Sequence, residues 1–224
     1  MSKTKLLSRG LALMLVGPLM LGAMLFLPAG TLRYGNAWLY LALLFLPMLL
    51  LGVVLFFKSP ALLEKRLNAK EKVGTQKRVI GASGVMFLAM FVLSGLDFRF
   101  GWSHVPSGLV ITAAVIQLLA YAMYAEVMRE NAYLSRTIEV QEGQKVIDTG
   151  LYGIVRHPMY AATLPLFLAM PLVLGSWVAF AVMLVYPVLI AVRIRNEEAV
   201  LEAGLEGYAD YKQRVKYRMI PFVW

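Results

Sequence analysis

Two short charged blocks in the second half of the chain contain the residue types from which a polar site can be built. The first is Arg156-His157-Pro158, and the second contains Glu197-Glu198. A guanidinium, an imidazole and two carboxylates can bind a charged ligand, and the imidazole and carboxylates can also transfer protons. Because Pro158 suits the first turn of a helix, we expect Arg156 and His157 just before a helix N-terminus, where exposed amides favour an anionic group. The alternative is that Arg156 anchors lipid headgroups and His157 caps the helix.

The second block has the spacing of ion pairs on a helix surface. A continuing helix places Arg193 and Glu197 at i,i+4, and it places Arg195 and Glu198 at i,i+3. Adjacent carboxylates at the end of an apolar stretch are costly to dehydrate unless they are paired. Two interpretations remain open from the spacing alone. The glutamates form surface ion pairs, or they belong to one polar site with the first block.

The segment between the two blocks decides whether they can meet. Residues Met159–Ile194 are almost entirely apolar and are interrupted at Gly175-Ser-Trp177. Because Gly and Ser favour a turn, we predict a helical hairpin over 159–194 with its tip at 175–177. Its arms are expected to be short or kinked, because they contain three prolines, Pro165, Pro171 and Pro187. Such a hairpin brings both charged blocks to the same end of a helical bundle.

Four further apolar stretches precede the charged blocks. Crossing the roughly 30 Å hydrocarbon core of a bilayer takes about 20 apolar residues as a helix. The stretches of this character are Leu11–Ala29, Ala37–Phe57, Val79–Leu96 and Val105–Ala125. Of all residues, 60% are hydrophobic and only 16% are charged, against roughly 25% charged in soluble domains. We therefore predict an all-α, integral membrane helical bundle. A cleaved secretory signal is the alternative for the first stretch, but the later spans favour a retained anchor.

The excess of basic residues predicts how this bundle lies in the membrane. The chain has 22 Lys and Arg against 13 Asp and Glu, a net charge of +9. All the basic residues except Arg33 and Arg99 fall at the N-terminus, in 58–78, in 126–158 or from Arg193 onward. Since basic loops stay in the cytoplasm, we expect six spans with both termini and the charged blocks cytoplasmic. The charge needs no nucleic-acid partner. Segment 58–78 is either a surface helix on anionic headgroups or a linker.

The composition argues against several classes of site. The chain has no Cys and two His. It therefore lacks a cysteine nucleophile and thiolate metal ligands, and a multi-histidine metal site is not expected. It contains neither G-x-G-x-x-G nor G-x-x-x-x-G-K-[ST], so soluble nucleotide-binding folds receive no support.

The motifs taken together resemble the isoprenylcysteine carboxyl methyltransferase family, which belongs with the integral-membrane, phospholipid methyltransferase-like proteins. The resemblance covers about 131–221, and the four upstream spans agree with the family in character only. It rests on Asn131-x-x-Leu134-Ser135, Gly143-Gln-x-Val-Ile-x-x-Gly150, Gly150-x-Tyr152-x-x-x-Arg156-His157-Pro158-x-Tyr160, Arg195-x-Glu197-Glu198-x-x-Leu201, and Tyr208-x-x-Tyr211 followed by Ile220-Pro221.

The resemblance implies S-adenosyl-L-methionine as the cofactor, held between the last helices and the cytoplasmic loops. The implied cofactor-binding residues are Gly150, Leu151, Tyr152, Val155, His157, Tyr160, Glu197 and Glu198, and the implied catalytic residues are Arg156, Arg195 and Glu198. Arg156 either binds the cofactor or orients a substrate carboxylate. The methyl acceptor is expected to be lipophilic and to come from the bilayer among membrane lipids, and neither a metal nor nucleic acid is expected.

On this interpretation the chain has two parts. They are 1–125, with four spans and the basic loop 58–78, and 126–224, a methyltransferase core made of the cytoplasmic loop 126–158, the hairpin 159–194 and a cytoplasmic C-terminal helix 196–217. Within the loop, alternating residues around Glu142-Gly143 predict two short extended pieces and a turn. The C-terminal helix is either a lid over the mouth of the site or ordinary packing.

The methyl acceptor and one rival function remain open. A carboxylate, as in an isoprenylcysteine, attacks a sulfonium methyl without a base, whereas a phospholipid amine or a thiol must lose a proton to a glutamate or His157. The rival is a membrane NADPH-dependent sterol or double-bond reductase. Such enzymes are expected to have Arg-His-Pro-Asn-Tyr followed by Gly-Asp, where this chain has Arg156-His-Pro-Met-Tyr-Ala-Ala162. The departure favours the methyltransferase. A third interpretation is a non-enzymatic lipid-binding protein, but it does not explain the two charged blocks.

Overall fold

The structure, a computed structural model, describes residues 3–67, 74–135, 138 and 140–224. These residues form helices joined by short turns and one long loop, without a β-strand among them. Five helical stretches are long and apolar enough to cross a membrane. Many large apolar side chains lie exposed on them, among them Leu19, Leu27 and Phe57 at 74–78%. The prediction of an all-α integral membrane bundle is confirmed.

The four predicted upstream spans all form helices that extend beyond their apolar cores. The helices are α1 (Lys3–Ala29), α2 (Gly35–Lys58), α4 (Gly74–Phe100) and α5 (Ser107–Glu130). Helix α1 packs closely on α4 because Gly95 has no side chain: a Cβ atom there would lie 2.5 Å from the backbone oxygen of Leu25.

The basic segment 58–78 forms a short surface helix in its described part. This helix, α3 (Pro60–Leu67), buries Leu62 against the ends of α2 and α5. Residues 68–73 lie outside the described residues. The described part therefore favours the surface helix over the linker.

The predicted hairpin is confirmed, with its tip where the glycine and serine lie. Helix α6 (Pro158–Leu174) ends at Gly175, which has the left-handed φ of 84°. Ser176 then caps α7 (Trp177–Met183), because its hydroxyl accepts the N–H of Ala179 at 3.0 Å. The second arm continues as α8 (Tyr186–Gly204) after a turn ahead of Pro187. Helix α6 is apolar but has only 17 residues, so it is not one of the five stretches, and the expected six spans are not confirmed.

A buried carboxylate fixes the hairpin tip to the rest of the bundle. Asp97, only 1% exposed, lies in the last turns of α4. It accepts hydrogen bonds from the backbone N–H of Ser103 at 2.7 Å and from the Ser103 hydroxyl at 2.5 Å, and a third from the hydroxyl of Ser176. Such a carboxylate tolerates burial because its oxygens are hydrogen-bonded. The hairpin is thereby positioned from the end opposite to the charged blocks.

The predicted C-terminal helix over 196–217 is wrong as a single helix. Helix α8 ends at Gly204, and a separate helix α9 (Tyr208–Arg214) follows. Gly207 adopts the left-handed φ of 79°, which a glycine accepts without strain, so the chain turns here. The turn buries an apolar cluster against the long loop; its buried members are Leu205, Tyr208, Tyr211 and Val215. Burial of this cluster stabilises the fold more than continuation of the α-helix would.

The long loop between α5 and α6 contains the predicted turn but no paired strands in its described part. Gly143 has a positive φ of 67° within the turn at Glu142–Gly143. A short 3-10 helix, η1 (Gly150–Gly153), precedes α6. Residues 136, 137 and 139 lie outside the described residues.

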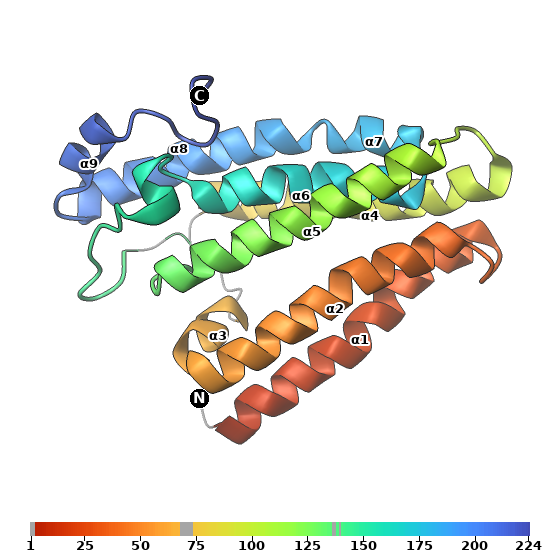
Figure 1. Ribbon diagram of the computed structural model, residues 1–224, viewed down its shortest axis with the longest axis horizontal. Helices are drawn as coiled ribbons and strands as arrows, with labels where there is room; N and C mark the ends of the chain where they lie inside the picture. Colours follow the sequence, from red (N-terminus) through yellow and green to blue (C-terminus); the bar gives the residue numbers. More distant parts are fainter. Residues whose placement is uncertain (1–2, 68–73, 136–137, 139) are drawn as a thin grey trace.

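The functional residues of both charged blocks lie at one end of the bundle. Figure 1 shows the long loop, the beginning of α6, the end of α8 and helix α9 together on the left, with the hairpin tip on the right. The start of α1 and helix α3 also lie on the left side of this view. The convergence predicted from the hairpin is therefore present.

Candidate active site

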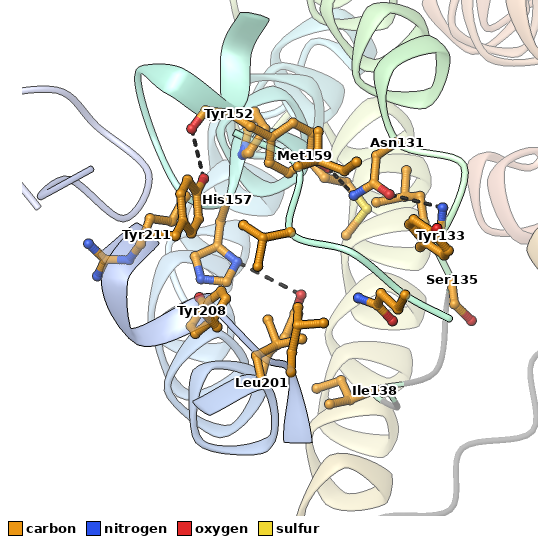
Figure 2. Close-up of a pocket in the computed structure, with 18 of the residues that line it drawn as sticks. Asn131, Tyr133, Ser135, Ile138, Tyr152, His157, Met159, Leu201, Tyr208 and Tyr211 are labelled. Atoms are coloured by element: carbon orange, nitrogen blue, oxygen red, sulfur yellow. Dashed lines mark hydrogen bonds and ion pairs between the residues drawn. The ribbon is translucent and has the colours of Figure 1, made fainter. Parts of the chain in front are cut away.

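A partly open cavity of about 100 Å³ lies where these segments meet. Its walls come from the long loop, the beginning of α6, the end of α8 and helix α9 (Figure 2). The described structure thus provides a concave site at the end of the bundle where both charged blocks lie.

Arg156 and His157 lie directly before the N-terminus of α6, as predicted. Helix α6 begins at Pro158. The backbone N–H of Arg156 donates to the oxygen of Tyr217 at 2.9 Å, and that of His157 donates to the oxygen of Arg218 at 2.7 Å. The segment after α9 therefore runs alongside these residues and holds their backbone.

Glu198 is the centre of a buried ionic group, which we call the Glu198 network (Arg156, His157, Glu198 and Arg218). Nε and Nη2 of Arg156 both lie 2.8 Å from Oε1 of Glu198, and Nε of Arg218 lies 2.8 Å from its Oε2. Nε2 of His157 lies 3.3 Å from Oε1. Glu198 is 3% exposed. A carboxylate this deeply buried is tolerated because two guanidinium groups compensate its charge.

Arg156 also joins the network to the C-terminal segment. Its Nη1 donates to the backbone oxygens of Val215 at 2.6 Å and Lys216 at 2.8 Å. Its side chain is 4% exposed. With Nε, Nη1 and Nη2 all bound to protein oxygens, this guanidinium works mainly as a clamp between α6, α8 and the segment after α9.

The interpretation in which Arg195 pairs with Glu198 on the helix surface is wrong. Arg195 lies exposed on α8, while the oxygens of Glu198 are bound by Arg156, His157 and Arg218. Residues three apart lie on the same face of a helix, but their side chains form an ion pair only when neither is bound by other partners. Here the face of Glu198 is covered by the segment after α9, which supplies Arg218 in place of Arg195.

Glu197 belongs to a second group that faces the cavity, the Glu197 cluster (Tyr160, Arg193 and Glu197). The Tyr160 hydroxyl donates to Oε2 of Glu197 at 2.6 Å, and Nε of Arg193 donates to that hydroxyl at 2.9 Å. All three side chains line the cavity. Oε1 of Glu197 lies 3.8 Å from Nδ1 of His157, beyond a hydrogen bond. The Glu197 side chain is 25% exposed, so one of its oxygens is accessible to a ligand.

The predicted site residues divide between the cavity wall and the structure behind it. Those on the wall are Tyr152, Arg156, His157, Tyr160 and Glu197, and those away from it are Gly150, Leu151, Val155, Arg195 and Glu198. The start of η1 instead packs on α5. The N–H of Leu151 donates to Oε2 of Glu130 at 3.1 Å, and a Cβ on Gly150 would collide with the same carboxylate.

Several cavity residues were not assigned from the sequence, although most lie in the motifs. Asn131 donates through Nδ2 to the Tyr152 hydroxyl at 2.9 Å, and the Tyr211 hydroxyl donates to the backbone oxygen of Tyr152 at 2.7 Å (Figure 2). Burial raises the pKa of Tyr152, so its phenol stays neutral at physiological pH. The remaining unassigned wall residues include Tyr133, Leu134, Ile138, Met159, Arg193 and Tyr208. For Asn131, Leu134, Tyr208 and Tyr211, membership of the motifs was the available signal.

The chain also matches known proteins over the part that builds this site. Residues 105–206 match the phospholipid methyltransferase family. The predicted resemblance to the membrane methyltransferases of the isoprenylcysteine methyltransferase-like kind is confirmed. The match supports a membrane methyltransferase.

One curated relative has a different activity in its name. It is the Delta(14)-sterol reductase TM7SF2 of Mus musculus, 32% identical over 91 residues. The aligned segment covers 39% of this chain and 22% of the mouse protein. The chain thus spans about a fifth of the length of that relative.

Proposed function

We propose that this protein is an integral-membrane, S-adenosylmethionine-dependent methyltransferase that acts on a lipophilic acceptor. The preferred acceptor group is a carboxylate, as in an isoprenylcysteine. The observation that carries the proposal is the cavity itself. It is built mostly by the family-matched region, with Tyr208 and Tyr211 added by α9, and the Glu197 cluster lies on its wall.

The polar side of the cavity suits a cationic, zwitterionic methyl donor. Oε1 of Glu197 is available to an ammonium or a hydroxyl group of a ligand. Five tyrosines also line the cavity, namely Tyr133, Tyr152, Tyr160, Tyr208 and Tyr211. Aromatic rings beside a carboxylate are a favourable environment for a sulfonium, since ring faces attract cations. These residues therefore fit S-adenosylmethionine.

Another part of the cavity wall suits the acyl or prenyl part of an acceptor. Leu134, Ile138 and Met159 line the cavity. Leu134 and Met159 also belong to an apolar cluster that includes Leu62 of α3. This cluster connects the cavity with the α2–α3 surface, so it supports approach of a lipophilic acceptor from the bilayer.

The reaction requires positioning more than proton transfer when the acceptor is a carboxylate. When bound, S-adenosylmethionine supplies an electrophilic methyl group on sulfur. Glu197 and His157 hold the donor side, and Arg193 is a cation on the same wall that can orient a carboxylate. Holding two reactants in line can lower the barrier by about 7–11 kcal/mol.

The distribution of charge supports a cytoplasmic site. The basic residues gather at the end of the bundle that holds the cavity, while Arg33 and Arg99 belong to the other end, where Arg99 lies against Gly30. Basic residues favour the cytoplasmic side of a membrane. We therefore place the cavity and both termini in the cytoplasm.

A membrane reductase is the second candidate, favoured only by the partial likeness to the sterol reductase. Met159 and Ala161-Ala162 stand where we expect asparagine and Gly-Asp in such enzymes. A direct comparison of ligands separates the two functions.

The test is calorimetric binding to the full-length protein in detergent. We expect S-adenosylhomocysteine to bind with a micromolar Kd and NADPH to show no binding. Binding of NADPH without binding of S-adenosylhomocysteine would overturn the proposal. A labelled-methyl transfer screen over prenylcysteines, isoprenoid acids, phospholipids and thiols then identifies the acceptor.

A further inference from the structure

Tyr208 lines the cavity and has a buried hydroxyl without a hydrogen-bond partner in the described part of the chain. The residue is the first of α9 and is 4% exposed. Figure 2 shows the ring below the imidazole of His157, on the side of the cavity formed by α9. A buried hydroxyl that stays unpaired costs free energy, so a native protein needs a reason to keep one.

Tyr211, one turn further along α9, shows that the fold can satisfy a buried phenol here. Tyr211 is 2% exposed, and its hydroxyl donates to the backbone oxygen of Tyr152 at 2.7 Å. The two rings lie 5.8 Å apart and belong to the same apolar cluster. A phenylalanine would fill the position of Tyr208 equally well as far as the protein's own contacts are concerned. The difference between the two tyrosines is that only the hydroxyl of Tyr208 is left for a ligand.

The surroundings of Tyr208 define what kind of ligand atom it can bind. Burial and the nearby carboxylates of Glu198 and Glu197 raise the pKa of Tyr208. The phenol therefore keeps its proton at physiological pH and can donate it to an oxygen or nitrogen acceptor. Glu197, which lines the same cavity, offers the complementary acceptor through Oε1. One donor and one acceptor on the same cavity match a ligand that carries both kinds of group.

We infer that the Tyr208 hydroxyl is a donor-binding group: it hydrogen-bonds an acceptor oxygen in the polar part of S-adenosylmethionine, while Glu197 binds an ammonium or hydroxyl group of the same molecule. The inference rests on the proposed function and adds a residue of α9 to the site. It also gives α9 a role beyond packing, since the helix carries a contact to the ligand.

The test is Tyr208→Phe, with Tyr211→Phe as the matched control. Tyr208→Phe removes a hydroxyl without a protein partner, so the thermal unfolding midpoint of the ligand-free protein stays the same or rises. Its affinity for S-adenosylhomocysteine falls by about 3- to 10-fold, the size of one neutral hydrogen bond. Tyr211→Phe removes a bond within the protein, so its unfolding midpoint falls while its affinity changes less than that of Tyr208→Phe.

Each result decides between a ligand contact and a structural residue. Wild-type affinity in Tyr208→Phe overturns the inference, and so does an unfolding midpoint that falls as far as in Tyr211→Phe. If the wild-type protein itself does not bind S-adenosylhomocysteine, the proposed function fails, and the ligand named for Tyr208 fails with it. A lower affinity of Tyr208→Phe for S-adenosylhomocysteine, at an unchanged unfolding midpoint, supports both this inference and the proposed function.

Discussion

Glu197 and Glu198 are neighbours in sequence, yet they belong to two regions with different tasks. Glu198 is 3% exposed, and both its oxygens are bound by side chains of the Glu198 network. Glu197 has one oxygen bound by Tyr160, and its side chain is 25% exposed on the cavity wall. The first region holds segments of the chain together, and the second lies on the cavity wall, where the proposed function has it meet the ligand. Identical residue types in one motif can therefore carry stability and binding separately.

Helix geometry and the C-terminal segment explain the division. Successive residues of an α-helix point about 100° apart, so the two glutamates can have different surroundings. The face that carries Glu198 is covered by the segment after α9, which brings Arg218 and two backbone oxygens that bind Arg156. The following predictions test this division, first through the Glu198 network and then through the Glu197 cluster.

The largest effect is expected from Glu198→Ala. The variant leaves the buried guanidinium of Arg156 and that of Arg218 without their carboxylate. Removing one partner of a buried ion pair typically costs about 3–5 kcal/mol, so the unfolding midpoint in detergent should fall steeply. Glu202→Ala is the control, because Glu202 forms an exposed pair with Lys212 on the same part of the chain. If Glu198→Ala had the same unfolding midpoint as the wild type, the Glu198 network would not stabilise the protein.

Glu197→Gln should show the opposite profile. Glutamine keeps an oxygen for the Tyr160 hydroxyl, so the unfolding midpoint should stay close to that of the wild type. The lost charge should lower the affinity for S-adenosylhomocysteine by about 10- to 100-fold, as expected for hydrogen bonds to a charged group. Calorimetry on this variant and the wild type measures the change. Unchanged affinity together with a lower midpoint would show that both glutamates are structural.

Arg218→Met measures the outer half of the Glu198 network. The variant removes one cation from Glu198 but leaves Arg156 in place. Because the Arg218 side chain is 29% exposed, solvent screens its pair, and we expect a loss of about 1–2 kcal/mol. Arg218→Lys should recover part of it. The thermal unfolding midpoints of the wild type, Arg218→Lys and Arg218→Met rank these three proteins by stability. A loss as large as that of Glu198→Ala would mean that Arg156 does not compensate the carboxylate alone.

The smallest effect is expected from Tyr160→Phe. The phenol hydroxyl donates to Glu197 and accepts from Arg193, so its removal loosens the Glu197 side chain while keeping the charge. We expect the affinity for S-adenosylhomocysteine to fall by about 3- to 5-fold, less than in Glu197→Gln. A larger fall than in Glu197→Gln would place the ligand contact on Tyr160 itself. Titration calorimetry resolves the two cases.

Much of the fold follows from local features of the sequence. The apolar stretches predicted the spans because a helix in a membrane satisfies its own backbone hydrogen bonds. Pro158 and Gly175 predicted where the first arm of the hairpin begins and ends, because each has a backbone conformation suited to that position. The hairpin in turn predicted that both charged blocks lie at one end. These inferences needed only residues close together in the chain.

The contacts that shape the site could not be predicted in the same way. The break between α8 and α9 depends on burial of Leu205 and Tyr208 against the long loop, far away in sequence. The anchoring of the hairpin tip by Asp97 depends on Ser103 and Ser176, which only the folded chain brings together. Such contacts join segments whose distance is set by the packing of whole helices, so no local pattern records them.

The sequence by itself determined a membrane bundle, a hairpin and the meeting of Arg156 and His157 with Glu197 and Glu198. Only the tertiary structure decided which glutamate faces the cavity, because the direction of each side chain depends on what covers its face of α8. The segment after α9 covers the side of Glu198 and supplies Arg218. Glu197 therefore keeps an oxygen toward the cavity.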